Sequence, residues 1–335
     1  MTRRIEDEHP ELFHYTGFDG LTGILESREL WATHARYLND GAELIEFRNY
    51  LPRILRPGVA KALDELYRSH SANRELIDKF GGLEASVSEV IRASVDALYH
   101  TTFGVDGSAP FAEAYILSFC TPATPRHADH GVLSQWRYYG QDGGYALVFD
   151  TAAISSAMTI EGRRWPNLLL FGGDVVYSDA PPEAVKTEFG ETLDVISNGL
   201  TEWVTSGNER KLDPLYPYLL LVSCRYKHWG FSEEREVRIV VVPPNAKIVA
   251  EMTRRREVTT EIPIHYRPGN GKPVPTIHLF DDYRALGRRL PIKRIVVGPG
   301  GDCRVRQGRV ERILKASGLD IPVNVSEIPY IDLRS

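Results

Sequence analysis

The chain has 335 residues, 42% of them hydrophobic and 25% charged, so it can bury a sizeable core in one large domain or two small ones. Its formal net charge of −5 argues against a nucleic-acid footprint over the whole molecule. Three widely separated cysteines, Cys120, Cys224 and Cys303, include no CxxC pair and indicate free thiols in a reducing compartment. The opening MTRRIEDEHPELF lacks an apolar signal core, and the longest apolar run, YPYLLLVSC, is too short for a bilayer. We therefore expect a cytoplasmic protein with no membrane partner.

The N-terminal part alternates between strand and helix patterns. Residues 11–16, ELFHYT, are typical of a short strand, a helical face follows in residues 18–25, and residues 29–33, ELWAT, are typical of a second strand. From about 41 to 103 the spacing of apolar residues is helical, with RPG at 56–58 and GG at 81–82 as expected interruptions. The pattern predicts a helical insertion within a single domain of residues 1–335.

Strand-like runs dominate the rest of the chain. They lie at residues 114–120, 144–150, 173–178, 218–224, 236–242, 276–281, 292–298 and 323–328. Helical patterns are confined to about 183–206 and about 303–317. Because strands and helices are partly segregated, the sequence predicts an α+β fold with mixed, largely antiparallel sheets rather than a regular βαβ array.

Three common kinds of site have little support. HADH (127–130) is dense in ligand atoms but lies in a Pro-rich polar stretch without a metal-binding frame, so a solvated loop is favoured and no metal is expected. IVVGPGGDCRV (295–305) lacks the third glycine of a dinucleotide fingerprint, which favours a tight strand-to-helix turn. There is no GxSxG motif, and no cysteine stands in an activating context.

Two segments are more specific. LSQWRYYGQDGGYALVFD places Trp136 and Tyr139 before a glycine turn and a strand. In KHWGFSEEREVRIVVV, a strand that began near Glu234 would put Glu234, Glu236 and Arg238 on one face. Such charges are costly to bury unless they are paired or hold a ligand, and a surface salt-bridge ladder is the alternative.

These segments, with FHYTGFDGLTGILESRELWATHARYLNDGAE and IKRIVVGPGG, resemble a bacterial family of unknown function. The resemblance covers nearly the whole chain apart from the helical insertion. Relatives in that family are associated with toxins and phage-defence systems. The resemblance therefore implies that this chain is a toxin or a phage-defence effector.

A more distant resemblance is to the ADP-ribosyltransferase fold, in which NAD binds between two small sheets. It implies an ADP-ribosyltransferase-like split-sheet core and NAD as substrate, without a metal. Glu236 would be the catalytic carboxylate and Glu234 its partner in an ExE-like pair, while His14 would contact a ribose hydroxyl beside Tyr15 and Thr16. The remaining cofactor contacts would be Arg36 at the pyrophosphate and Tyr37, Tyr139 or Trp136 stacked on nicotinamide.

The function expected from this resemblance is an ADP-ribosyltransferase or NAD glycohydrolase, with the acceptor, protein or nucleic acid, left open. One alternative is a nucleic-acid-binding or nucleic-acid-cleaving module, because Arg304, Arg306, Arg309 and Arg312 recur at near-helical spacing. The other is a module that senses a nucleotide without turning it over. In every case the expected partner is a nucleotide or nucleic acid.

Overall fold

We describe the protein from a computed structural model in which residues 4–38, 44–104, 110, 112–139, 143–165, 168–244, 249, 254, 261–269 and 271–330 are described. The fold is α+β with a mixed, mostly antiparallel sheet, which confirms the predicted class. Its likeness to an ADP-ribosyltransferase core stays a prediction. None of the described helices is long and apolar enough to cross a membrane, and all three cysteines are free.

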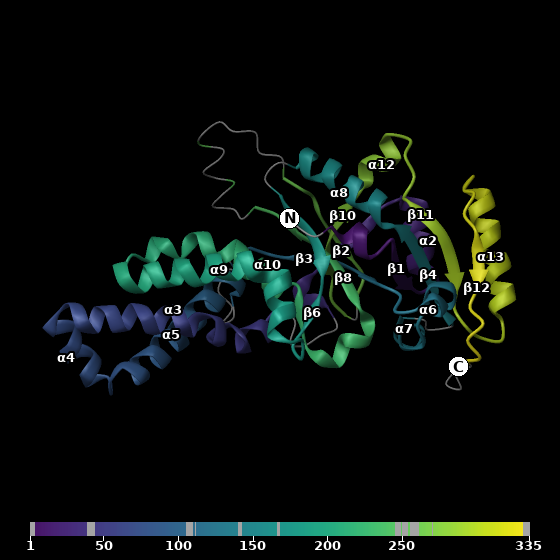
Figure 1. Cartoon of the computed structure of the whole chain (residues 1–335). Helices are drawn as coiled ribbons and strands as arrows, with labels where there is room; N and C mark the ends of the chain where they lie inside the picture. Colours follow the sequence, from purple (N-terminus) through teal and green to yellow (C-terminus); the bar gives the residue numbers. More distant parts are fainter. Residues whose placement is uncertain are drawn as a thin grey trace.

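Ten of the described strands form one sheet, and two short strands pair separately (Figure 1). The main order is β12-β11-β4-β1-β3-β2-β10-β9, with β8 and then β5 branching from β3. The strands are β1 Glu11–Thr16, β2 Leu30–His34, β3 Tyr115–Cys120, β4 Tyr145–Asp150, β5 Leu169–Asp174, β6 Val176–Tyr177, β7 Tyr226–Lys227, β8 Glu236–Val242, β9 Ile264–Arg267, β10 Val274–Leu279, β11 Ile292–Val297 and β12 Val323–Val325.

The sheet divides along one edge of β3. Strand β8 pairs with β3 over its whole length, from Tyr115 to Cys120, and therefore occupies one edge. Both β1 and β2 must lie on the other edge, where β2 pairs with the start of β3 and β1 meets it only at Cys120. Between these two contacts the edge of β3 has no ladder partner among the described strands.

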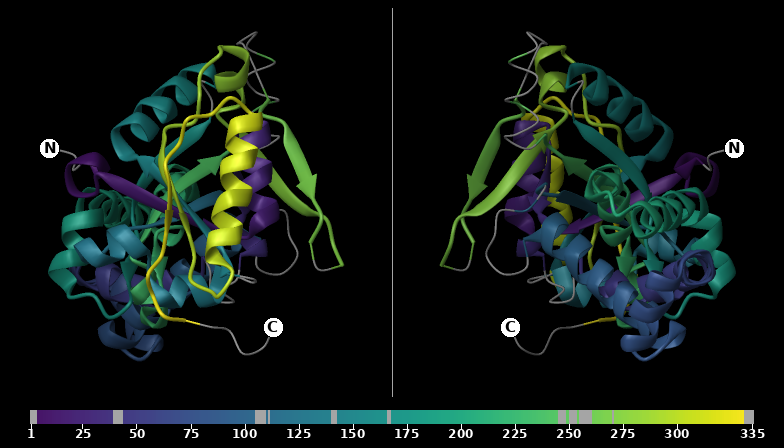
Figure 2. Two further views of the ribbon diagram at one scale, coloured as in Figure 1. Left: turned by 90° about the vertical axis from the view of Figure 1, so that its right-hand side faces the viewer. Right: turned by 90° about the vertical axis from the view of Figure 1, so that its left-hand side faces the viewer.

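The helices form two groups around the sheet. Helices α3, α5, α9 and α10 pack together as an arm that extends from one side of the sheet, with α4 at its far end, whereas α2 and α13 lie side by side at the opposite end (Figures 1 and 2). The helices are α1 Ile5–Glu8, α2 Phe18–Ser27, α3 Leu51–Ser69, α4 Ser71–Lys79, α5 Leu83–Phe103, α6 Pro125–His130, α7 Leu133–Tyr139, α8 Thr151–Arg164, α9 Pro182–Ser206, α10 Tyr216–Ser223, α12 Asp281–Ala285 and α13 Cys303–Ala316.

The two faces of the sheet bury different cores. The face that carries Leu117 and Phe119 packs into a core with α2, α8 and α13. On the other face, Ile116 joins the core shared with the helical arm, and Phe13 joins a smaller core with Trp136 of α7. Ser118 and Cys120 of β3 lie on the same face, between these last two cores, and the candidate site is formed beside them.

Two helices correct the sequence analysis. Residues 218–224 were expected to form a strand, but Tyr216–Ser223 is α10, because a short continuous apolar run fits a largely buried helix as well as a buried strand. RPG at 56–58 was expected to interrupt the helical pattern, yet α3 runs through it. Gly58 is needed there because a Cβ atom would lie 2.6 Å from the Thr201 hydroxyl of α9.

The sequence analysis also missed α1, α6, α7, α8 and α12, and two of these have recognisable start signals. Pro125–His130 is a short helix rather than a solvated loop, since the Thr124 side chain accepts from the His127 N–H and a proline occupies the first turn. Likewise, the carboxylate of Asp150 accepts from the Ala153 N–H and begins α8.

A charge cluster ties the first strand to the end of the sheet. Glu11 of β1 accepts two hydrogen bonds from Arg294 of β11, at 2.6 and 2.7 Å, and Lys293 lies 2.8 Å from the same carboxylate. The bonds from Arg294 outweigh the effect of burial and lower the pKa of Glu11 from 4.5 to about 2.

We expect Glu11→Gln to destabilise the protein at neutral pH and to have little effect near pH 2. A carboxyl group with a depressed pKa stabilises the folded state above its unfolded value of about 4.5, and that contribution is lost as the pH falls toward 2. Urea unfolding of both proteins across this range measures the difference. Equal differences at pH 7 and pH 2.5 would contradict the assignment, and Glu84→Gln, at an exposed surface pair, is the control.

Candidate functional site

The two predicted catalytic carboxylates meet, although not by strand alternation. Strand β8 begins at Glu236, whereas Glu234 ends the 3₁₀ turn η6, Trp229–Glu234, and the intervening Arg235 has a left-handed backbone with φ of 44°. The Lys227 Nζ atom of β7 joins the two carboxylates, at 2.8 Å from Glu234 Oε2 and 3.0 Å from Glu236 Oε2. The strand therefore covers the predicted run 236–242 and does not begin near Glu234, so Glu234 and Glu236 are brought together by the turn and by Lys227.

Both carboxylate oxygens of Glu236 accept hydrogen bonds, and the residue is only 4% exposed. Arg238 of the same strand donates to both of its carboxylate oxygens, from Nε at 2.8 Å and from Nη2 at 3.0 Å. A third donor of Arg238 bonds the Cys224 carbonyl at 2.6 Å, and the Ser118 hydroxyl also bonds Glu236. The surface salt-bridge alternative is wrong, because these charges are buried and mutually paired.

The environments of the two carboxyl groups shift their pKa values in opposite directions. Burial raises the pKa of Glu236, but Arg238 and Lys227 together outweigh burial and lower it to about 2. Burial also raises the pKa of Glu234, and Lys227 offsets only part of that effect. The site therefore contains a permanently ionised carboxylate beside one that gains a proton more readily, a pattern that can divide charge stabilisation from proton transfer.

Two tyrosines and a thiol complete the cluster. The Tyr177 hydroxyl of β6 accepts from the Glu236 N–H at 3.0 Å. Burial, reinforced by the charges of Glu234 and Glu236, raises the pKa of both Tyr139 and Tyr177, so both phenols stay neutral. Burial likewise raises the pKa of Cys120, whose thiol lies 3.4 Å from the Gln135 side-chain oxygen. A neutral buried thiol is a poor nucleophile.

His14 does not face this cluster. In β1 its neighbour Phe13 pairs with Cys120, on the face that carries Glu236, whereas His14 pairs with Leu147 on the opposite face. Its ring lies edge-on to Phe119, and its Nδ1 atom is 3.1 Å from the Ser118 carbonyl oxygen, at the unpaired edge of β3. Burial lowers its pKa, so the ring is neutral. The resemblance places both His14 and Glu236 at NAD, and their positions on opposite faces of the sheet do not fit that expectation.

Tyr15 and Trp136 hold the connection between α6 and α7. The Tyr15 hydroxyl accepts from the Val132 N–H at 3.0 Å, and the Trp136 indole donates to the His130 carbonyl at 3.0 Å. The two rings meet edge to face with centroids 4.8 Å apart. Both side chains are buried, which leaves Tyr139 as the one of the three proposed stacking residues that lies beside the carboxylates.

The other predicted cofactor contacts lie elsewhere. Thr16 packs against Gly20 of α2, where a Cβ atom would collide with its hydroxyl. Arg36 donates to the carbonyls of Phe103 and Gly104 at the end of α5. Tyr37 is 42% exposed and lies edge-on to His34. None of these residues contacts Glu234 or Glu236 in the described structure.

The C-terminal arginines do not form one solvent-facing row. Arg306 of α13 is buried and donates to the carbonyls of Gly144, Gly298 and Pro299. This arginine therefore secures the glycine turn between β11 and α13, as expected for a tight strand-to-helix turn.

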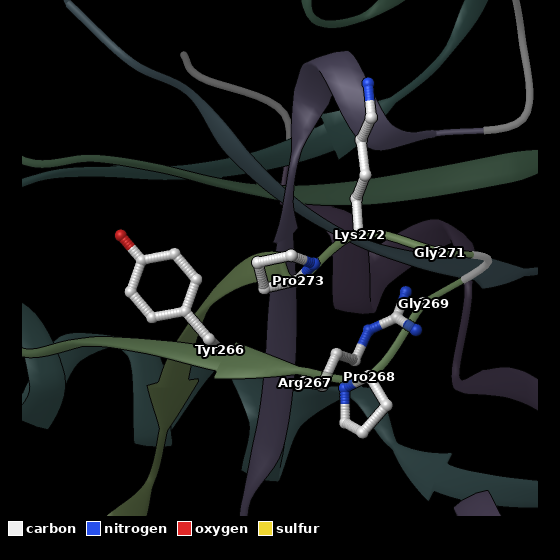
Figure 3. A pocket seen from close by; sticks show the side chains of 7 residues that line it. All are labelled: Tyr266, Arg267, Pro268, Gly269, Gly271, Lys272 and Pro273. Atoms are coloured by element: carbon white, nitrogen blue, oxygen red, sulfur yellow. The ribbon is translucent and has the colours of Figure 1, made fainter.

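A shallow cavity of about 420 Å³ lies on the β9–β10 hairpin, lined by residues 266–269 and 271–273 (Figure 3). Strands β3, β2 and β10 separate it from β8, so it is distinct from the carboxylate cluster.

The sequence analysis assigned no role to Lys227, Tyr177 or Ser118. Lys227 opens the segment KHWGFSEEREVRIV, and the need of two buried carboxylates for a cation could have identified it. Tyr177 and Ser118 come from distant strands, and only the strand pairing brings them to Glu236.

Comparison with known proteins supports one of the resemblances. Residues 135–239 match the model of a family described as a protein of unknown function (DUF2971), which confirms the predicted likeness to an uncharacterised domain family. The matched segment contains Tyr139, Lys227, Glu234, Glu236 and Arg238. No curated protein and no solved structure matches the chain.

We expect Lys227→Met to lower the free energy of unfolding at pH 7 by about 3–5 kcal/mol, because it leaves two buried carboxylates without their shared cation. Lys211→Met removes an exposed pair with Glu202 and should cost no more than about 1 kcal/mol. Urea unfolding measures both changes, and a similar small loss in the two variants would show that the cluster is solvated.

Proposed function

We propose that the protein is an NAD-cleaving enzyme, an ADP-ribosyltransferase or NAD glycohydrolase, whose chemistry takes place at Glu234 and Glu236. The observation that carries the proposal is the pair of carboxylates, one buried and one partly buried, that Lys227 joins and whose pKa values shift in opposite directions. His14 has a supporting role in this proposal, because it bonds the Ser118 carbonyl on the other side of the sheet.

The reaction breaks the bond between the nicotinamide nitrogen and C1′ of the ribose. The bonding electrons leave with nicotinamide, which departs as a neutral molecule, and positive charge develops on C1′ and the ring oxygen. The fixed negative charge of Glu236 stabilises that cation, and no rearrangement is required because Arg238 and Lys227 already hold the carboxylate. Tyr139 would stack on the nicotinamide ring.

Glu234 would act as the general base. Water, or a hydroxyl or amine of an acceptor, attacks C1′ and transfers its proton to the Glu234 carboxylate. A raised pKa makes Glu234 a better base than an ordinary glutamate, while Lys227 orients it. The products are nicotinamide and ADP-ribose, free or attached to the acceptor. An enzyme that consumes NAD in this way could serve as a toxin or phage-defence effector.

We expect the purified protein to release nicotinamide from NAD, and Glu236→Gln to reduce kcat about 10²- to 10³-fold through loss of the fixed charge. Chromatographic assay of nicotinamide measures the rate, and circular dichroism checks that the variant folds. Glu233→Gln, at the exposed neighbouring position, is the matched control and should retain full activity. No release by the wild-type protein would rule out the proposal. Stabilisation by NAD without any release would instead indicate a sensing module.

The same assay separates two arrangements of the site. If His14 only supports the sheet, His14→Asn should lower the melting temperature and leave kcat within about threefold of the wild type, since no contact with the substrate is lost. A folded His14→Asn protein with kcat reduced as strongly as in Glu236→Gln would place His14 at the substrate and overturn the assignment.

The pH dependence tests the general base. Because Glu234 must be ionised to accept a proton, kcat/KM should fall as the pH drops through its raised pKa, giving an acid limb. Glu234→Gln should slow the reaction about 10²- to 10⁴-fold and remove that limb. An unchanged acid limb in Glu234→Gln would assign the base to another group.

A further inference from the structure

A second group of polar side chains lies on the other face of β5. Glu8 is the last residue of α1, His9 follows it before β1, and Asp174 ends β5. The imidazole Nε2 atom of His9 is 2.7 Å from Asp174 Oδ1, and the donor atoms of all three residues lie within 4.8 Å of one another. Segments 165 residues apart thus bring one nitrogen and two carboxylate oxygens close together.

The segment that carries these groups is fixed from several directions. Ile5 of α1 packs into the core, the Glu6 carboxylate accepts from the Ser155 hydroxyl at 2.8 Å, and the His9 N–H bonds the Ile5 carbonyl at 2.8 Å. Asp174 occupies the end of a paired strand, opposite Val237 of β8. The three donors therefore come from ordered backbone on both sides, which lowers the cost of assembling a coordination site.

Among the described residues, the charges on α1 favour a cation. Asp7 adds a further carboxylate to Glu6 and Glu8 on α1, whereas the nearby Arg4 is largely exposed and lies 3.8 Å from Glu6. The Arg225 Nε atom donates to the backbone carbonyl of Asp174 at 3.2 Å. Its guanidinium packs over Gly173, which pairs with Arg238, and therefore lies on the opposite face of the sheet from the Asp174 side chain.

We propose that Glu8, His9 and Asp174 form a binding site for a divalent transition-metal ion of the Zn²⁺ class. Imidazole nitrogen with two carboxylate oxygens suits Zn²⁺ or Mn²⁺ better than Mg²⁺ or Ca²⁺, which prefer oxygen ligands alone. Donors at about 2 Å from the ion would lie roughly 3.4 Å apart. His9 Nε2 and Asp174 Oδ1, now 2.7 Å apart, would separate slightly, and the Glu8 carboxylate, within 4.8 Å of both, would adjust to complete the site. His9 is 16% and Asp174 34% exposed, so water can complete the coordination.

The proposed ion would take the place of the hydrogen bond between His9 Nε2 and Asp174 Oδ1. Its structural effect would be to clamp α1 to the end of β5, since the ligands come from both elements. The proposal does not depend on NAD cleavage, and its test uses binding rather than activity.

The test is titration of the metal-stripped full chain with ZnCl₂ at pH 7.5, followed by isothermal calorimetry and thermal unfolding. We expect one tightly bound equivalent and a raised melting temperature, with binding weakened at least about tenfold in His9→Gln and in Asp174→Asn. His127→Gln removes a histidine outside the site and should bind Zn²⁺ as the wild type does.

Two results would overturn the proposal. One is the absence of Zn²⁺ binding, and the other is wild-type affinity in the folded His9→Gln protein, which would reduce the His9–Asp174 contact to a simple ion pair. Because His9 lies at the chain's N-terminal edge, His9→Gln keeps the test decisive even if Asp174→Asn fails to fold. Equal affinity for MgCl₂ would contradict the assigned metal class.

Discussion

The buried ion network around Glu236 constrains this part of the fold more than any apolar contact does. A buried carboxylate without its partner costs several kcal/mol, so Lys227, Glu234 and Arg238 must all stay in place together. They come from β7, the η6 turn and β8, and the Glu236 N–H adds β6 through the Tyr177 hydroxyl. The network therefore ties β6, β7 and the η6 turn, which are short and have few ladder hydrogen bonds of their own, to β8, which pairs with both β3 and β5. The same charges produce the opposed pKa shifts on which the proposed chemistry depends.

The division of the sheet at β3 determines which side chains can meet there. Side chains alternate between faces, so neighbouring residues of β1 have different surroundings. Phe13 faces the ion network, while His14 turns to the other core and uses its Nδ1 atom for the Ser118 carbonyl. That carbonyl lies where β1 and β2 separate, and a buried acceptor without a partner is unfavourable. A histidine at this position is explained by the backbone it supports.

Much of the fold could be predicted because the spacing of apolar residues along the chain reflects which side chains are buried. ELFHYT, YALVFD and EVRIVVV are strands as expected, and the helices before β2 and after β11 begin close to their predicted positions. The failures have physical causes that composition does not reveal: YPYLLLVSC forms a largely buried helix, and Gly58 lets α3 approach α9. At the site, two carboxylates in one segment could be recognised. Ser118 and Tyr177 could not, since strand register alone brings them to Glu236.

The ion network around Glu236 and the group formed by Glu8, His9 and Asp174 lie on opposite faces of the paired strands β5 and β8. Gly173 pairs with Arg238, and its missing side chain leaves room for the Arg225 guanidinium on the face of the ion network. The next residue, Asp174, points to the face that carries α1 and His9. One residue further on, the Val175 N–H donates to the Glu236 carbonyl at 2.9 Å. Asp174 and Glu236 are thus coupled through a single residue of backbone, so a ligand that fixes Asp174 would also restrain the strand end that carries the proposed catalytic carboxylate.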